Sequence, residues 1–457
     1  MEESTSSSSQ GLTSEKVVVA QDYTKKYYQR VVNDQRAFMN EHSQVRQKKM
    51  TLGDFELLDV IGRGAFGEVR LCHPANHPDM IYAIKILRKD YMLQKKQVLR
   101  VRAELKIYML QKKQVLRVRA ERDLLVACTK SQFISQWTVE LFQSFQDQNY
   151  LYFVMEYCPG GDLMSWLMKL DVFEEHIAKF YTAELVVAVQ ALHASGFAHR
   201  DLKPDNVLLD RSGHVKLTDF GLAKPIPEEL SQVSSAMSSG HEDSPSEDSD
   251  QHPESAERRA LWHQIRSRRM FFSAVGSPGY IAPEVLLKSG YGLECDWWSV
   301  GVILYEMLCG YPPFYSDDTL KVSQKIIRHR EFLEFPTGQE ALSPQAVDLI
   351  RHLITDAPQR FGFAEISQHP FFSDIDWSTL RIQAPPFSVD LSGPRDIRYF
   401  HDIPAAGAES DQPLGPLAKS DQMLFSGFTS RFDSNTKQST RSGVKRSARP
   451  PIADFDE

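Results

Sequence analysis

The most constraining feature of this chain is the octapeptide His199–Asn206 (HRDLKPDN), which is followed by a DFG triplet beginning at Asp219, 219 − 206 = 13 positions later. That interval fits a short hairpin, so the two polar turns are expected to lie side by side. Asp201 can then accept the proton of a hydroxyl group, Lys203 can neutralise a phosphate, and Asn206 and Asp219 can hold metal ions. An ordinary polar turn is the alternative, and eight residues in this order argue against it.

A glycine-rich segment precedes these turns, because Ile61–Arg70 (IGRGAFGEVR) carries Gly62, Gly64 and Gly67 in G-x-G-x-x-G spacing. Glycines allow backbone N–H groups to approach phosphate oxygens closely, where a Cβ would obstruct them. A dinucleotide-binding loop has the same spacing but requires a helix directly after it. Here Glu68–Leu71 continue as a strand, which favours a hairpin lid.

A strand-like segment, Tyr82–Lys85 (YAIK), follows the glycine-rich loop and ends in a lysine. A lone lysine at the end of an apolar strand is usually a surface residue. After a glycine hairpin, Lys85 is also a candidate cation for the α- and β-phosphates of a nucleotide, held by a glutamate from a following helix.

The apolar pattern divides the chain into two unlike parts. Phe55–Leu71 and Ile81–Leu87 have strand-like patterns, whereas helical spacing dominates from Glu174 onward. A small strand-rich lobe followed by a larger helical lobe is therefore expected. Residues 226–257, rich in Ser, Glu, Asp and Pro, predict an inserted disordered loop, and a basic amphipathic stretch, Arg258–Met270, comes directly after it.

The charge of the chain is unevenly distributed. The formal net charge is −7, and residues 228–257 contribute nine acidic and no basic side chains, which leaves −7 − (−9) = +2 for the rest. A claim about nucleic-acid or membrane partners from the net charge would therefore rest on an average over unlike parts, and no nucleic-acid partner is expected. Residues 17–50 look helical and carry seven Lys/Arg between Lys25 and Lys49. A solvated helical face is the usual explanation of such a stretch, and a docking arm for an acidic partner is the alternative.

The sequence predicts neither a membrane span nor a secretory leader. No apolar run reaches about 18 residues, and the first residues lack the basic and apolar regions of a signal peptide. The five cysteines are scattered and form no CxxC pair, which argues against a disulfide framework or a structural zinc site. A soluble protein of a reducing compartment, cytoplasmic or also nuclear, is expected.

One segment of the chain is duplicated without change. Tyr91–Glu104 (YMLQKKQVLRVRAE) recurs at Tyr108–Glu121, an offset of 108 − 91 = 17 residues. An α-helix turns by about 100° per residue, so this offset leaves the two faces roughly 100° apart. Both copies cannot present the same face on one straight helix. One copy is expected to pack against the rest of the protein. The other copy is expected to be looped out or merely to lengthen the connection before the helix.

The duplication leaves the glutamate partner of Lys85 ambiguous. Glu104 lies 104 − 85 = 19 positions after Lys85, the interval of the family named below, and Glu121 lies 121 − 85 = 36 positions after it. Glu121 is preferred because only this copy leads into Arg122–Leu125 and the strands beyond. A longer connection before the helix has a modest entropic cost.

The glycine loop, Lys85, the HRD and DFG turns and Ala282-Pro283-Glu284 occur in an order that resembles the protein kinases. This resemblance implies an α+β, bilobal protein kinase fold, with a small β-rich lobe that carries one helix (αC) and a larger helical lobe. Lys203 within HRDLKPDN resembles the serine/threonine class. Residues 55–432 are similar, more narrowly, to the AGC kinases and their NDR/LATS branch, which adds a C-terminal tail.

Three segments carry the narrower resemblance. The activation segment holds a long insert that ends in FFSAVGSPGYIAPEV (Phe271–Val285), Arg119–Asp123 is similar to the αC sequence of that branch, and Leu424–Phe432 (LFSGFTSRF) is similar to its hydrophobic motif. The sequence differs from that branch in two features. The basic arm is shorter than that of relatives, and Gly279 replaces the aspartate of the usual GTPDY, which puts substrate specificity in doubt.

The resemblance implies an ATP- and Mg²⁺-dependent enzyme that phosphorylates serine or threonine in basic sequence contexts, and it assigns roles to individual residues. The implied catalytic residues are Asp201, Lys203, Asn206, Lys85 and Glu121, and the implied metal ligands are Asn206 and Asp219. Implied nucleotide contacts are Ile61, Gly62, Gly64, Phe66, Gly67, Val69, Ala83, Lys85, Met155, Glu156, Cys158, Asp162, Leu208 and Phe400. Asp162 and Asp205 match positions that receive basic substrate residues.

Regulation is implied in the same way. Ser273 matches an activation-loop phosphorylation site whose phosphate would pair with Arg200, and Thr429 matches a hydrophobic-motif site modified by an upstream kinase, for which Lys112 and Lys113 are candidate phosphate receivers. Arg258–Met270 resembles an autoinhibitory stretch. An unmodified loop hydroxyl is the alternative for both phosphorylation sites.

The expected organisation follows from these motifs. Residues 1–14 form a disordered N-terminus, 15–54 a basic helical arm for a MOB-family coactivator, 55–372 the kinase domain with an insert at 226–270, 373–432 the C-terminal tail, and 433–457 a disordered end. Glu284 is expected to form a buried pair with Arg360, or else both are surface charges. A kinase-fold scaffold without catalysis and a kinase of another AGC subfamily are the competing hypotheses.

Overall fold

The structure is a computed structural model that describes residues 50–64, 66–93, 103–225, 258–260, 262, 278–400, 417 and 419–429. Several predictions lie outside these residues: the disordered N-terminus, all but the last five residues of the arm at 15–54, most of the insert at 226–270, the segment around Ser273, and the end at 433–457. No helix in the described ranges is both long and apolar enough to cross a membrane.

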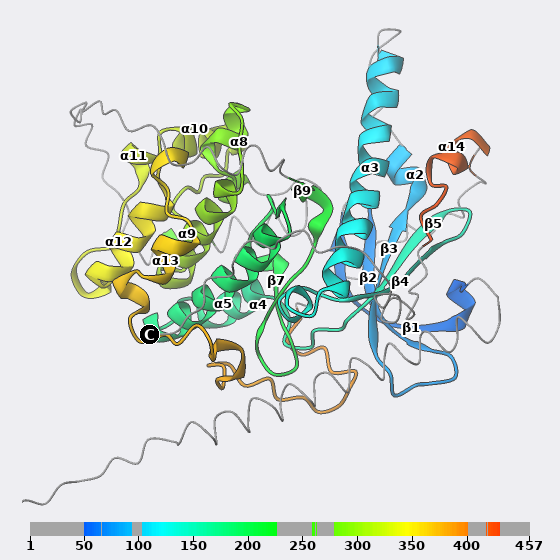
Figure 1. Ribbon diagram of the computed structural model, residues 1–457, viewed down its shortest axis with the longest axis horizontal. Coiled ribbons are helices and arrows are strands. Elements are labelled where there is room, and N and C mark those ends of the chain that lie inside the picture. The colour runs from blue at the N-terminus through cyan, green and yellow to red at the C-terminus, as the bar shows by residue number, and fades with distance from the viewer. Residues whose placement is uncertain are drawn as a thin grey trace, which may run out of the picture.

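The small lobe is one antiparallel five-stranded sheet with strand order β1-β2-β3-β5-β4 (Figure 1). Its strands are β1 (Phe55–Gly64), β2 (Gly67–Pro74), β3 (Tyr82–Arg88), β4 (Leu141–Gln146) and β5 (Tyr150–Met155). The glycine-rich segment forms the β1–β2 hairpin, in which Gly64 pairs with Gly67. The strand predicted over Phe55–Leu71 is therefore two strands joined by a tight turn.

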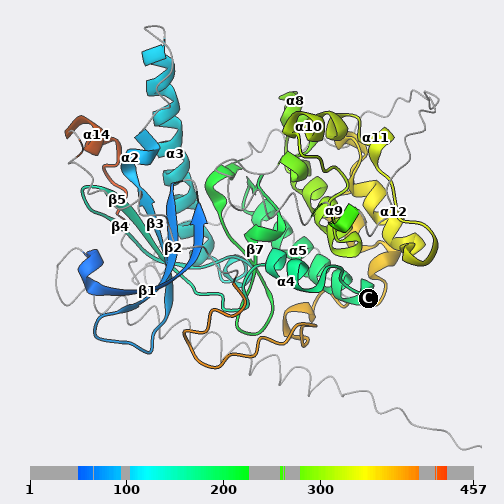
Figure 2. The same ribbon diagram turned by 180° about the vertical axis from the view of Figure 1, so that it is seen from behind.

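The large lobe is mainly helical and lies beside the small lobe, as both views show (Figures 1 and 2). Its helices are α4 (Leu163–Leu170), α5 (Glu175–Ala194), α8 (Pro283–Leu287), α9 (Glu294–Cys309), α10 (Thr319–Ile327), α11 (His329–Phe332), α12 (Pro344–Leu353) and α13 (Phe363–Ser367). Two short two-stranded sheets, β6 (Phe197–Ala198) paired with β9 (Lys224–Pro225) and the hairpin of β7 (Val207–Leu209) with β8 (Val215–Leu217), lie toward the small lobe. The predicted α+β bilobal architecture is confirmed.

The core of the large lobe forms around α9. Of its sixteen residues, Cys295 through Cys309 are all buried, because α5 and α12 pack against it. A helix that is apolar on all sides belongs in the interior of a protein. The apolar run Ser299–Cys309 thus lies in the interior of the large lobe, and α9 begins five residues before it.

The duplicated segment is divided between two helices. Helix α2 (Lys89–Leu93) holds the start of the first copy, which continues outside the described residues and ends at Glu104 in helix α3 (Ala103–Lys130). The second copy lies wholly within α3, and its Val115, Val118 and Glu121 are buried. The second copy therefore supplies the packed face of α3, while the helix projects beyond the sheet at its N-terminal end (Figure 1).

The first part of the C-terminal tail packs along the large lobe and reaches the connection between the lobes. The indole ring of Trp166 stacks on Phe387 with ring centroids 4.2 Å apart. Gly161, with φ +71°, lies so close to the tail that a Cβ there would be 2.1 Å from the Tyr399 carbonyl oxygen. Only glycine fits this contact, and it places Phe400 beside the interlobe connection.

Candidate active site

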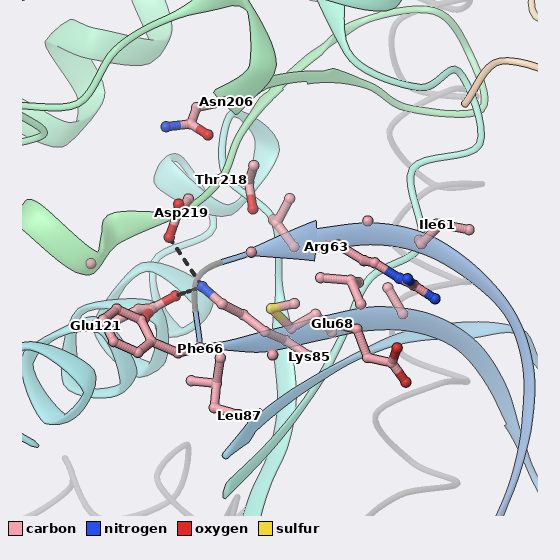
Figure 3. Close-up of a pocket in the computed structure, with 18 of the residues that line it drawn as sticks. Ile61, Arg63, Phe66, Glu68, Lys85, Leu87, Glu121, Asn206, Thr218 and Asp219 are labelled. Carbon is pink, nitrogen blue, oxygen red and sulfur yellow. Dashed lines mark hydrogen bonds and ion pairs between the residues drawn. The ribbon is translucent and has the colours of Figure 1, made fainter. Parts of the chain in front are cut away.

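A cavity of 530 Å³ lies between the lobes. Its walls come from the glycine hairpin, β3, α3, the β5–α4 connection, the turns before β7 and after β8, and the tail (Figure 3). All the predicted nucleotide contacts line it, together with Glu121, Asn206 and Asp219. Further lining residues that the sequence motifs did not single out include Leu87, Val139, Tyr157 and Thr218.

A half-buried lysine joins the two lobes inside this cavity. Lys85 Nζ lies 2.6 Å from Glu121 Oε1 on α3 and 3.0 Å from Asp219 Oδ1, and both contacts are drawn in Figure 3. Burial disfavours the charged form of Lys85, but the two carboxylates outweigh it and raise its pKa above the ordinary value. The same ammonium group lowers the pKa of Asp219 to about 2.

The HRD turn places three predicted catalytic groups together. Lys203 Nζ lies 3.2 Å from Asp201 Oδ2, and Asn206 Nδ2 donates to the Asp201 carbonyl oxygen at 2.7 Å and to Asp201 Oδ2 at 3.2 Å. The amide nitrogen of Asn206 is thereby fixed on Asp201, and its oxygen lies on the side of Thr218 (Figure 3).

A buried carboxylate that the motifs did not assign holds this turn in place. Asp296, at the start of α9, accepts the backbone N–H groups of His199 at 2.7 Å and Arg200 at 2.8 Å, and lies 2.7 Å from His193 Nε2. Burial alone would raise the pKa of Asp296, but these hydrogen bonds outweigh it and lower the pKa. Arg200 has φ +68°, so Asp296 stabilises a strained turn.

The rear of the cavity has an apolar wall and two backbone groups available to a planar ligand. In the described part of the chain, neither the Cys158 N–H nor the Glu156 carbonyl has a hydrogen-bond partner. Because buried backbone groups are normally paired, this donor and acceptor fit the edge of a purine. Phe400 stacks on Tyr157 at 5.9 Å and closes the outer side.

A model of the protein kinase domain matches residues 55–241 and 261–372. The chain belongs to the protein kinase family. The sequence is 40% identical to the serine/threonine-protein kinase CBK1 of Pneumocystis carinii over 414 residues, which cover 86% of this chain and 77% of that relative. It is 38% identical over 400 residues to the probable serine/threonine-protein kinase ndrB of Dictyostelium discoideum, covering 86% and 70% of the two chains. The predicted serine/threonine class and NDR/LATS branch are therefore confirmed.

The end of the kinase tail docks on the small lobe beside α3. Phe425 and Phe428 are buried, and Phe428 packs edge-on against Phe153 of β5 at 5.2 Å. Arg119 donates to the carbonyl oxygens of Leu424 and Ser426, and Arg122 to those of Gly427 and Phe428, at 2.6–2.8 Å. Thr429 follows directly, whereas the side chains of Lys112 and Lys113 lie outside the described residues.

A second basic group lies with Arg200 near the DFG turn of the kinase. The Arg200 guanidinium lies 4.6 Å and Lys224 Nζ 5.7 Å from the centre of the Tyr291 ring. Arg200 Nε is buried without a partner in the described residues. The sequence motifs pointed to Arg200 alone. Lys224 was detectable only from its position three residues after the DFG triplet, where it begins strand β9.

One cluster in the kinase resembles a metal site but does not fit one. Ligand atoms of Asp348, His352 and His369 lie within 4.8 Å of one another. His369 Nδ1 accepts the Phe371 N–H at 3.2 Å, and its Nε2 lies 3.0 Å from Asp348 Oδ2. A metal-bound histidine normally donates from its second nitrogen, whereas here that nitrogen accepts. His369 therefore caps the turn Pro370–Phe372.

Proposed function

We propose that this kinase transfers the γ-phosphoryl group of ATP to serine or threonine hydroxyls in basic sequence contexts, with Mg²⁺ as its cofactor. The observation that carries the proposal is the chain of contacts from Glu121 through Lys85 to Asp219 within the interlobe cavity. Lys85 positions the α- and β-phosphates, Asp201 orients the hydroxyl and accepts its proton, and Lys203 offsets the charge on the transferred group. Catalysis is then mainly positioning and electrostatics.

The residues present fit a magnesium ion. Mg²⁺ prefers carboxylate and amide oxygens, and the bonds of Asn206 Nδ2 to Asp201 leave its amide oxygen for a cation. Asn206 and Asp219 would hold the ion. When bound, it neutralises charge on the β- and γ-phosphates. Asp219 stays ionised across the physiological pH range because Lys85 lowers its pKa to about 2.

Basic-context specificity is supported by the charge at the edge of the cavity. Asp162 and Asp205 both line it. One oxygen of Asp162 accepts the Ser165 N–H at 2.7 Å and caps helix α4, which keeps the carboxylate in place without removing its charge. A substrate arginine would therefore meet fixed negative charge there.

An assay with two matched peptides tests the proposed function. Phosphate from Mg-ATP is expected in a serine peptide with arginines before the acceptor, and replacing these arginines by glutamate is expected to lower kcat/KM at least tenfold, which corresponds to about 1.4 kcal/mol. Chelation by EDTA is expected to stop incorporation. Nucleotide binding without phosphate transfer to any peptide would favour the scaffold alternative, and equal rates for both peptides would contradict basic-context specificity.

The two copies of the duplicated segment are expected to differ in their effect on catalysis. Glu121→Gln is expected to lower kcat by about 10²-fold, the scale of a misplaced reacting group, because Lys85 loses its charged partner on α3. Glu104→Gln changes the same residue in the matching position of the first copy and is expected to leave kcat unchanged. Steady-state kinetics on both variants would decide between them, and the reverse ranking would show that Glu104 has the role.

The same proposal includes two regulatory phosphorylations. A phosphate on Ser273 would pair with Arg200 and Lys224, and one on Thr429, added by an upstream kinase, would strengthen the docking of the tail end beside Arg119 and Arg122. Binding of a MOB-family coactivator to the arm and a cytoplasmic, also nuclear, location belong to the proposal too. What supports them is the likeness of these segments to the NDR/LATS branch.

A further inference from the structure

The last part of the insert, where the chain returns to the large lobe, forms ion pairs with that lobe. We call residues 258–260 and 262 the return segment. Arg258 lies 2.7 Å from Glu334, and Arg259 lies 3.0 Å from Glu340 and 3.1 Å from Asp171. These three acidic residues come from three different places in the large lobe, so the return segment ties separate elements together.

The shape of this surface matches the return segment closely. Gly310 ends α9 with φ +81°, and a Cβ at that position would lie 2.6 Å from Arg259 Cδ and 2.8 Å from the Asp171 carbonyl oxygen. The Arg258 guanidinium lies 6.0 Å from the centre of the Tyr311 ring. The site therefore receives the aliphatic stems of the arginines as well as their charges.

Trp262 is the apolar part of the contact. Its side chain is only 5% exposed, its ring packs edge-on against Tyr315 at 6.3 Å, and its Nε1 donates to Glu306 Oε1 at 3.2 Å. A tryptophan that buries its ring and pairs its N–H combines apolar burial with a directional bond. Isolated ion pairs at half-exposed positions contribute little, so Trp262 is expected to dominate.

The contact also reaches the end of the activation segment. Glu306 is 1% exposed, and its second oxygen accepts the hydroxyl of Tyr280 at 2.5 Å. Tyr280 lies in the 3-10 turn Pro278–Tyr280, and its carbonyl accepts the hydroxyl of Ser299 in α9 at 2.8 Å. One buried carboxylate thus joins the return segment to the turn that leads into α8.

We propose that the return segment is a self-docking element, and that its occupation of this acidic and aromatic site stabilises the Pro278–Tyr280 turn through Glu306. The occupant is this chain's own basic, tryptophan-containing segment. The inference goes beyond the proposed phosphoryl transfer, because docking and the order of the turn are properties of the folded chain without nucleotide.

Limited proteolysis tests the docking in the full-length protein. Trypsin is expected to cleave after Arg259 at least tenfold more slowly in the wild type than in a synthetic peptide of residues 252–265, and Trp262→Ala is expected to remove most of that protection. Arg258→Glu is expected to speed cleavage after Arg259, and the double variant Arg258→Glu/Glu334→Arg to restore protection. Arg328→Glu, which breaks the separate pair with Glu331, is the matched control and should not alter that cleavage rate.

Hydrogen exchange tests the link through Glu306. Trp262→Phe keeps an aromatic ring in the site but removes the N–H donor together with part of the indole ring, so it is expected to retain most of the protection from trypsin while exchange of the amides at 279–286 becomes at least threefold faster. Cleavage after Arg259 that is equally fast in the wild type and the peptide, or equally slow in the wild type and Trp262→Ala, would overturn the docking. Unchanged exchange in both Trp262 variants would overturn the link. Neither measurement uses ATP, so the outcome of each is independent of the outcome of the phosphoryl-transfer assay.

Discussion

Asp201→Asn is expected to lower kcat for peptide phosphorylation by about 10²–10⁴-fold, the contribution of a positioned general base. The substitution keeps the shape of the side chain and an oxygen that can still accept from Lys203 and Asn206, which lie 3.2 Å from Asp201 Oδ2. The substitution removes the charge that, in the proposed function, orients the substrate hydroxyl and takes its proton. Steady-state kinetics with a basic serine peptide would measure the loss.

The control for this variant is nucleotide affinity. Asp201 does not line the interlobe cavity, and Asp296 holds the HRD turn through backbone groups, so Kd for ATP and the unfolding midpoint should remain those of the wild type. A variant that phosphorylated the peptide at the wild-type rate would refute the catalytic assignment. A variant that lost nucleotide binding as well would show that Asp201 supports the cavity instead.

Arg360→Ala is expected to lower the free energy of unfolding by about 3–5 kcal/mol, the cost of leaving one member of a buried ion pair alone. Arg360 makes two parallel contacts with Glu284, at 2.6 Å and 3.1 Å, and it also donates to the carbonyl oxygens of Thr355 and Glu294. Its side chain is fully buried. Removing this side chain leaves the Glu284 carboxylate and two carbonyl oxygens without this donor in the interior of the large lobe.

Urea denaturation of Arg360→Ala, Glu284→Ala and the double variant would test this expectation. The double variant should be less destabilised than the sum of the two single variants, because neither charge then remains without its partner. Arg328→Ala, whose pair with Glu331 is exposed, should change the free energy of unfolding only slightly. An Arg360→Ala loss of that same small size would show that the buried pair does not stabilise the kinase.

Local patterns predicted more of the fold than of the contacts. The strand alternation around the glycine loop, the helical large lobe and the apolar run of α9 are properties of neighbouring residues, and the structure confirms them. The pairing of Glu284 with Arg360 spans 76 residues, yet it was predictable because an ordered set of family motifs surrounds both. Asp296 lies 90 or more residues after the HRD turn, and nothing near it in the sequence indicates that it accepts the N–H groups of His199 and Arg200.

The sequence by itself determined which chemical groups this kinase possesses: a glycine-rich hairpin, a lysine, the aspartate of the HRD turn and the side-chain oxygens of Asn206 and Asp219, each part of a short motif. Only the tertiary structure decided which distant groups meet. It placed Glu121 beside Lys85 across 36 residues, Lys224 beside Arg200 on one tyrosine ring, and the return segment against Glu306 across 44 residues. The physical reason is that a motif depends on backbone conformation within a few residues, whereas these contacts depend on how two lobes and an insert pack around buried charge.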